Sequence, residues 1–163
     1  MTRVRNKKKD DGGFFGIGIY QAKHFENVGV LWRGAYQLGA AFIFTVGKRY
    51  RPPATDVAMA WIHIPLYNYG SFDECVAALP YSCRLVGVEM GGKPLPGVAH
   101  PDRAVYILGA EDGGLPSHVI ERCHSLISIP SVRSASYNVA QAGTIVMYDR
   151  LVKTSPTVRS SPT

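Results

Sequence analysis

The chain has 163 residues, of which 46% are hydrophobic and 18% are charged. This composition is typical of a compact folded protein and excludes a chain that is disordered over most of its length. No apolar run reaches the roughly 18 residues of a membrane-spanning helix, and no secretory signal follows the basic start at residues 1–9. The formal charge of +6 favours a polyanionic partner, although part of that charge lies in the basic start.

Cysteine usage argues against covalent or metal cross-links. Cys75, Cys83 and Cys123 are an odd number of cysteines with no C-x-x-C spacing. They support neither a disulfide framework nor a zinc site, so we expect no bound metal and a cytoplasmic location. Cys123 and His124 could form a metal-binding or nucleophilic pair. The plainer interpretation, a helix that ends where a strand begins, is favoured.

Short apolar runs alternate with helical patterns between two segments expected to be disordered, residues 1–12 and the Ser/Thr/Pro tail 153–163. Strands are predicted at 14–20, 41–46, 60–64, 84–89, 104–108 and 125–129. Helices are predicted at 28–38, 71–79, 116–123 and 138–152. This alternation predicts one α/β domain over 13–152, with a mainly parallel sheet and helices on both faces. Ligands of such sheets bind at the carboxyl ends of the strands.

Two of the helices carry local signals. One apolar face of the first helix is formed by residues at helical spacing, Val28, Leu31, Trp32 and Ala35. Asn27 precedes them and is predicted to cap the helix. Ser71 and Glu74 have the spacing of a capping box at the start of the second helix.

Glycine spacing excludes two common nucleotide sites. Gly16-Ile17-Gly18 follows part of the G-x-G-x-x-G pattern, but the final position is Gln21. The sequence also contains no G-x-x-x-x-G-K-[ST] loop. We therefore expect neither a dinucleotide-binding fingerprint nor a P-loop.

Arg33 lies about 200° around the first helix from Leu31, so it points away from the apolar face. It could be an ordinary exposed arginine, or it could contact a phosphate or ribose at a cleft. Gly109 and Glu111 lie in a glycine-rich turn after a strand, which could admit a ligand to the main chain or simply connect two elements.

The last predicted helix has two polar residues at its start. Ser136 and Asn138 could cap that helix, or they could hydrogen-bond a ligand at its N-terminus.

In this order and spacing, three segments resemble the motifs of the SPOUT superfamily, in its SpoU/TrmH-like branch of RNA ribose 2′-O-methyltransferases. The first motif corresponds to Asn27, Gly29 and Arg33. The second corresponds to L-G-A-E-D-G-G-L at 108–115. The third corresponds to I-P at 129–130 followed by S-Y-N-V-A-Q-A at 136–142. The resemblance spans roughly residues 14–152.

The resemblance implies a C-terminal deep trefoil knot, a homodimer and S-adenosylmethionine as methyl donor, with S-adenosylhomocysteine as product. The implied donor-binding residues are Val88, Leu108, Gly109, Ile129, Ser136 and Asn138. The implied catalytic residues are Arg33, Asn27, Glu111, Ser136 and Asn138, with Arg33 in a positioning and electrostatic role.

For the substrate, the resemblance favours tRNA over rRNA and a ribose oxygen over a base. A base methyltransferase of the same fold is one alternative. A dimeric RNA-binding protein without catalysis is another.

Overall fold

The computed structural model describes residues 13–51, 63–133 and 135–155. Its six strands form one sheet in the order β3-β2-β1-β5-β4-β6, and all of the strand pairings are parallel. The strands are β1 (Phe14–Tyr20), β2 (Phe42–Val46), β3 (Leu66–Tyr69), β4 (Arg84–Pro94), β5 (Arg103–Leu108) and β6 (Ser125–Ser128). The predicted parallel α/β sheet is therefore confirmed.

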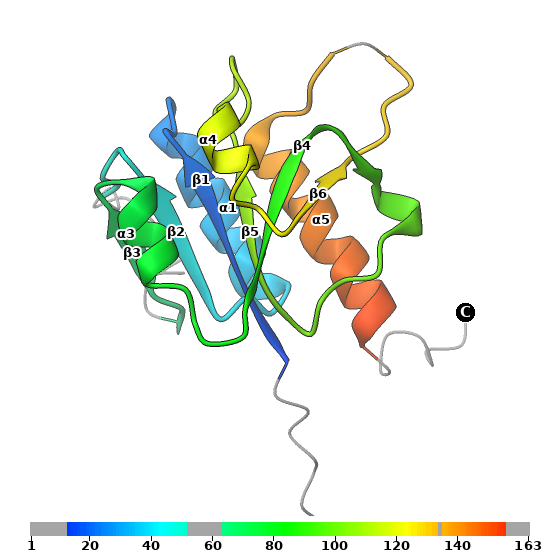
Figure 1. Cartoon of the computed structure of the whole chain (residues 1–163), viewed down its shortest axis with the longest axis horizontal. Helices are drawn as coiled ribbons and strands as arrows, with labels where there is room; N and C mark the ends of the chain where they lie inside the picture. The colour runs from blue at the N-terminus through cyan, green and yellow to red at the C-terminus, as the bar shows by residue number, and fades with distance from the viewer. Residues whose placement is uncertain (1–12, 52–62, 134, 156–163) are drawn as a thin grey trace, which may run out of the picture.

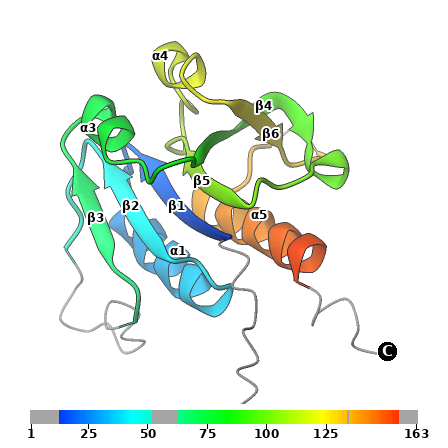
Figure 2. The ribbon, with the colours of Figure 1, turned by 60° about the horizontal axis from the view of Figure 1, so that its bottom comes forward.

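Helices cover both faces of the sheet, as predicted, and Figure 2 shows the two layers from the side. The helices are α1 (Phe25–Gln37), α3 (Phe72–Ala77), α4 (Ser117–Ile120) and α5 (Val139–Thr154), with a 3-10 turn at Leu95–Gly97. Helices α1 and α5 share one hydrophobic core with β1, while α3 and α4 share a second core with the opposite face. Because all strands run in one direction, their carboxyl ends meet at the upper edge in Figure 1.

Strand β1 matches its predicted bounds, and its glycines serve packing. A Cβ atom at Gly16 would overlap the ring of Phe42, and one at Gly18 would overlap the ring of Phe44. Both aromatic side chains belong to the neighbouring strand β2. The Gly16-Ile17-Gly18 segment therefore brings two strands and their rings together.

Helix α1 buries Val28, Leu31, Trp32 and Ala35, the four residues of the predicted apolar face. The predicted start of this helix is wrong. It begins at Phe25, after His24, and His24 makes no side-chain cap. Asn27 lies inside the first turn, where its side chain is bonded to residues from other parts of the chain.

The predicted strand at 60–64 is wrong where the structure describes it, because His63 is helical and Ile64 lies in a bend. Residues 60–62 of that prediction lie outside the described residues. The strand in this region is β3, which begins at Leu66 on the edge of the sheet. An edge strand tolerates exposed polar residues such as Asn68, so it lacks the apolar run on which the prediction depended.

The start of α3 agrees with the predicted cap. The Ser71 hydroxyl accepts a hydrogen bond from the Glu74 amide at 3.2 Å. The Glu74 carboxylate accepts from the Gly70 amide at 2.8 Å rather than from Ser71. The cap is therefore present, with its return bond shifted by one residue.

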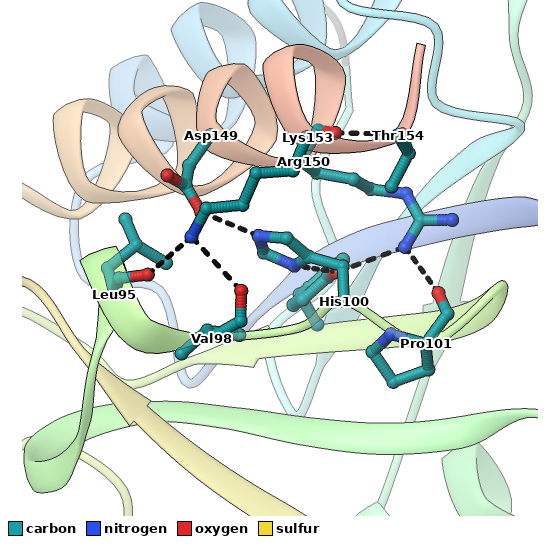
Figure 3. Close-up of polar contacts among 9 residues, drawn as sticks. Leu95, Val98, His100, Pro101, Asp149, Arg150, Lys153 and Thr154 are labelled. Carbon is teal, nitrogen blue, oxygen red and sulfur yellow. Dashed lines mark hydrogen bonds and ion pairs between the residues drawn. The ribbon is translucent and has the colours of Figure 1, made fainter. Parts of the chain in front are cut away.

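Helix α5 runs further than predicted, so Lys153 and Thr154 belong to the helix and not to a tail. Lys153 explains the extension, because its ammonium donates to the carbonyls of Leu95 at 2.6 Å and Val98 at 3.0 Å (Figure 3). The predictions for residues 1–12 and 156–163 lie outside the described residues. In the described part of the chain, no helix combines the length and hydropathy needed to cross a membrane.

Candidate functional site

A cavity of about 610 Å³ lies at the carboxyl ends of β4, β5 and β6. One wall is residues 88–91 of β4, where the pairing of β4 with β5 ends, and a second is residues 108–114 at the end of β5 and in the turn after it. The third wall lies between β6 and α5, and Ala142 of α5 completes the cavity; the lining residues of this wall are Ser128, Ile129, Ser131, Arg133, Ala135, Ser136, Tyr137 and Val139. A volume of this size falls in the range of roughly 300–1,000 Å³ that is typical of small-molecule sites. The three strand ends were predicted to meet, and the structure confirms that they do.

Most of the predicted donor-binding residues line this cavity. They are Val88, Leu108, Gly109, Ile129 and Ser136. Asn138 does not line it directly, but it lies between two lining residues in sequence, Tyr137 and Val139. The lining is apolar at Val88, Leu108 and Ile129 and polar at the loops, which suits a ligand with both kinds of surface.

Glu89 joins the first wall of the cavity to the second. Its carboxylate accepts hydrogen bonds from the Leu115 amide at 2.6 Å and from the Met90 amide at 2.9 Å. A Cβ atom at Gly114 would overlap this carboxylate, and Gly114 has a φ of +61°, so the turn requires glycine there. Sequence reasoning placed the strand end at Glu89 beside the site but gave its carboxylate no role. Its only signal was a carboxylate at the end of a buried strand.

Gly109 has a structural role as well as a place in the cavity wall. A Cβ atom at Gly109 would overlap the main chain of Gly114, across the turn that the bridge between Ala110 and Gly114 closes. The interpretation of Gly109 as part of a tight connection is therefore confirmed, and the approach of a ligand to its main chain stays a prediction. Lys23 forms an ion pair with Asp112 at the tip of the same turn, and this hydrogen bond and the positive charge lower the pKa of the Asp112 carboxyl.

Three of the predicted catalytic residues meet at the rim of the cavity. The Asn27 amide donates to Oε1 of Glu111, and the Asn138 amide donates to Oδ1 of Asn27 at 3.0 Å. Asn138 also caps α5, since its side-chain oxygen accepts from the amides of Ala140 at 2.9 Å and Gln141 at 3.3 Å. The predicted capping role of Asn138 is therefore confirmed, and a hydrogen bond from Asn138 to a ligand stays a prediction.

One atom of this group lacks a partner. Oε2 of Glu111 is buried and accepts no hydrogen bond from the described residues. Leaving a buried carboxylate oxygen unpaired costs on the order of 1–3 kcal/mol, more when the group is charged. Such an atom in a cavity wall is an acceptor available to a ligand.

The third wall is the segment between β6 and α5. The Tyr137 hydroxyl donates to the Pro130 carbonyl at 2.8 Å, and the Ser131 hydroxyl donates to the Arg133 carbonyl at 2.6 Å. Arg133 is exposed and lines the cavity, so it brings a positive charge to the rim. Sequence reasoning did not assign Arg133 to the site.

Arg33 lies apart from this cavity. It is exposed on the solvent face of α1, as its helical position predicted, and it makes no hydrogen bond or ion pair with the described residues. It is six residues beyond Asn27, a rise of about 9 Å along the helix. The structure therefore brings together Asn27, Glu111 and Asn138 but leaves Arg33 outside the cavity of its own chain.

The Cys123–His124 pair has the plainer role. The His124 ring accepts from the Leu85 amide at 2.9 Å, and the His124 amide donates to the Leu85 carbonyl at 2.8 Å. Burial raises the pKa of the Cys123 thiol to about 11 and that of Cys75 to about 12, so neither thiol is an activated nucleophile. Among the described residues, no group of three or more His, Cys, Asp or Glu side chains is placed to hold a metal ion.

With this geometry in place, comparison with known proteins identifies relatives. Residues 15–148 match the SpoU rRNA methylase family. An "uncharacterized tRNA/rRNA methyltransferase" from Archaeoglobus fulgidus is 26% identical over 148 residues. That match covers 87% of this chain and 66% of the archaeal protein, so the chain spans just under two thirds of the relative's length.

Solved structures share the fold. The SpoU methyltransferase AviRb from Streptomyces viridochromogenes, in complex with AdoMet, has a TM-score of 0.75 at 22% identity, over 85% of this chain and 57% of AviRb. A protein solved for insight into "2-OH methylation of C/U34 on tRNA" also has a TM-score of 0.75 at 22% identity, over 86% of this chain and 96% of its own.

Proposed function

We propose a function on one premise: the chain belongs to the SpoU rRNA methylase family. It transfers a methyl group from S-adenosylmethionine to a ribose 2′ oxygen of tRNA. The observation that carries the proposal is the cavity at three adjacent strand ends, with the linked side chains of Asn27, Glu111 and Asn138 at its rim. The structure solved in the context of tRNA 2-OH methylation, of which the match covers 96%, supports tRNA as the substrate.

The residues present fit this donor. Val88, Leu108 and Ile129 offer apolar surface for a neutral adenine ring, and the adjoining glycine-rich main chain offers hydrogen-bonding groups. Glu89 and Glu111 place carboxylates in the walls, which suits a ligand that carries a positive charge. When bound, S-adenosylmethionine supplies an electrophilic methyl group on a sulfonium sulfur.

The chain's own residues then orient the acceptor. Asn27 and Asn138 hold the Glu111 carboxylate in one position, so that its free Oε2 can accept a hydrogen bond at a fixed place. The Arg33 guanidinium offers a planar fork of N–H donors and no acceptor, so it acts on the phosphate beside the target ribose and stabilises the developing negative charge on the 2′ oxygen. It does not act as a base.

The position of Arg33 supports a homodimer. On the same solvent face of α1, Val30 is 58% exposed, and on the outer face of α5, Tyr148 is 58% exposed. A second copy that covers these two helices would bury both side chains. We place Arg33 at this interface, where it reaches toward the cavity of the partner chain.

Methylation of total tRNA with labelled donor tests the proposal, followed by mass spectrometry of the nucleosides. A 2′-O-methylated nucleoside is expected, and Arg33→Ala should abolish the product while donor binding, measured by calorimetry, is retained. A methylated base, or product formed only on rRNA, would replace the ribose or tRNA assignment. Absence of donor binding in the unmodified protein would favour an RNA-binding protein without catalysis.

Mixing two inactive variants tests the dimer. Arg33→Ala lacks the arginine, and Glu111→Ala lacks the cavity carboxylate, so a mixed dimer rebuilds one complete site. After exchange of subunits, about a quarter of the unmodified activity should return, since half of the dimers are mixed and each has one site. If mixing restores nothing while both variants remain dimeric by light scattering, Arg33 does not act across the interface.

Membership of the family also supports proposals about the knotting of the chain and its location in the cell. Helix α5 follows the edge strand β6 and returns to pack on α1 beneath the centre of the sheet. We propose that this return passes through a loop as a deep trefoil knot, which a chain trace in an experimental density map would test. We also propose that the domain over residues 13–152 acts in the cytoplasm.

A further inference from the structure

A second basic feature lies at the same edge of the sheet as the cavity. Lys48, Arg49 and Arg51 follow β2, and all three side chains are exposed. None of them makes an ion pair or a hydrogen bond with the described residues. We call these three residues the basic loop. It follows a strand end on the upper edge in Figure 1, where the walls of the cavity also begin.

Tyr50 anchors this loop to the body of the protein. Its side chain is buried, and its ring packs edge-on against Phe25 at 5.8 Å and Trp32 at 6.2 Å between ring centroids. The Tyr50 amide donates to Oδ1 of Asn68 at 2.9 Å, and the Thr45 hydroxyl donates to the same oxygen at 2.7 Å. The basic loop is therefore held in place before any partner binds.

The basic side chains of the basic loop differ from two other basic residues of the chain in that they form no ion pair with the described residues. Lys23 pairs with Asp112, and Arg122 pairs with Asp73. The basic loop places three positive charges within four residues, and no carboxylate of the described residues pairs with them. A fixed cluster of unpaired like charges attracts a polyanion, and it gains free energy from counterion release when it contacts phosphates.

An exposed aromatic ring lies between the basic loop and the cavity. Phe25 begins α1, packs against Tyr50, and is 46% exposed. Lys23 precedes it and contacts Asp112 in the cavity wall. Glu26 is the one acidic residue among positions 23–27. Basic side chains beside an exposed aromatic ring are the combination that binds single-stranded nucleic acid, through phosphates and base stacking.

We propose that the basic loop and Phe25 bind the RNA strand that flanks the target nucleotide. Lys48, Arg49 and Arg51 contact its phosphates, and Phe25 stacks on one of its bases. This inference rests on the proposed function for the identity of the polyanion. It adds a binding surface that is separate from the cavity and from Arg33.

The test measures the affinity of the full chain for fluorescein-labelled total tRNA as a function of KCl concentration. The triple variant K48S/R49S/R51S should reduce the slope of log affinity against log salt by about 2, since each contact to a single strand contributes roughly 0.7. Its affinity at moderate salt should fall on the order of tenfold. Each single substitution should reduce the slope by roughly 0.7, so the proposal stays testable even if the triple variant folds poorly.

Two controls separate this surface from general charge loss. Arg84→Ser removes an exposed charge at the amino end of β4, at the opposite edge of the sheet, and should leave the slope unchanged. Phe25→Ala should weaken binding without changing the slope, whereas Phe25→Tyr should bind as the unmodified protein does. Equal slopes for the triple variant and the unmodified protein would overturn the proposal, as would equal effects of Arg49→Ser and Arg84→Ser.

The salt dependence of binding tests the basic loop separately from the proposed methyl transfer. If the unmodified protein transfers no methyl group but the triple variant still lowers the salt slope, the binding surface stands and the proposed function fails. If methyl transfer to tRNA is observed and the triple variant has the same salt slope as the unmodified protein, the proposed function stands and RNA binding by the basic loop is excluded. Tighter binding to anionic vesicles than to tRNA would also exclude RNA as the partner of this loop.

Discussion

The two ends of helix α5 both carry polar networks, but the networks differ in whether their groups are satisfied. At the N-terminal end, Asn138 connects to Asn27 and Glu111, and one buried oxygen of Glu111 has no partner among the described residues. At the C-terminal end, Arg150 donates to the Pro101 carbonyl at 2.5 Å and the Asp102 carbonyl at 2.8 Å. The first network borders a cavity, and the second is closed by protein.

The C-terminal network is continuous (Figure 3). The His100 ring bonds to the Tyr106 hydroxyl at 2.6 Å and to the Asp149 carboxylate at 2.7 Å, and Lys153 bonds to the same carboxylate at 2.7 Å. Its side chains tie the end of α5 to the segment before β5. A saturated buried network stabilises one conformation, whereas an incomplete network beside a cavity leaves capacity for a ligand. Loss of the C-terminal network should therefore affect folding, and loss of the N-terminal network should affect catalysis.

The largest effect on stability is expected for Arg150→Ala. Arg150 is 6% exposed, and its removal leaves two carbonyls and the Tyr106 hydroxyl without this donor. The free energy of unfolding in urea should fall by about 3 kcal/mol. Methyl transfer per folded molecule should not change. Arg84→Ala is the matched exposed control, with an expected change within about 0.5 kcal/mol, and a similar small change for Arg150→Ala would contradict this role.

A smaller effect on stability and a clear effect on catalysis are expected at Asn138. Asn138→Ala removes the cap of α5 and should cost about 1 kcal/mol of unfolding free energy. Asn138→Ser retains a capping oxygen, so its stability should be close to that of the unmodified protein. Both variants lose the amide that donates to Asn27, so both should lower kcat/KM by about tenfold or more, equivalent to about 1.4 kcal/mol. Full activity in Asn138→Ser would reduce Asn138 to a helix cap.

The smallest expected effect is a pH dependence of the free energy of unfolding, and it comes from His100 in the C-terminal network. Burial lowers the pKa of His100 below the ordinary 6.5, and the positive charges of Arg150 and Lys153 also lower it, while Asp149 opposes the shift. The unfolded chain therefore takes up a proton at higher pH than the folded protein. The contribution of His100 to stability is complete above about pH 6.5 and is lost as the pH falls through the lowered pKa.

Urea unfolding of the unmodified protein and of His100→Gln, at about pH 8 and about pH 5, measures this contribution. The unmodified protein should lose more unfolding free energy than His100→Gln over this interval. His24→Gln, at an exposed position, should retain the full pH dependence. If His100→Gln has the same pH dependence as the unmodified protein, the buried imidazole is not its source.

Local sequence patterns predicted the elements whose buried residues recur at a regular spacing. The apolar residues of β1 and the buried face of α1 could be identified because neighbouring residues alone set their periodicity. The edge strand β3 was missed, since its two central residues are exposed and its four residues do not form an apolar run. The role of Asn27 was also misjudged: a cap is the common use of asparagine near a helix start, and the competing partners are distant in sequence.

By itself, the sequence determined the parallel α/β sheet, the apolar faces, the three motifs and the strand ends at which they lie. The tertiary structure decided which groups are left unsatisfied. Asn27 and Asn138 are 111 residues apart, and their hydrogen bond exists only because α1 and α5 pack side by side on one face. The same packing turned Arg33 outward, away from its own cavity. Periodicity is a property of adjacent residues, whereas hydrogen-bond partners depend on which distant segments the sheet brings together.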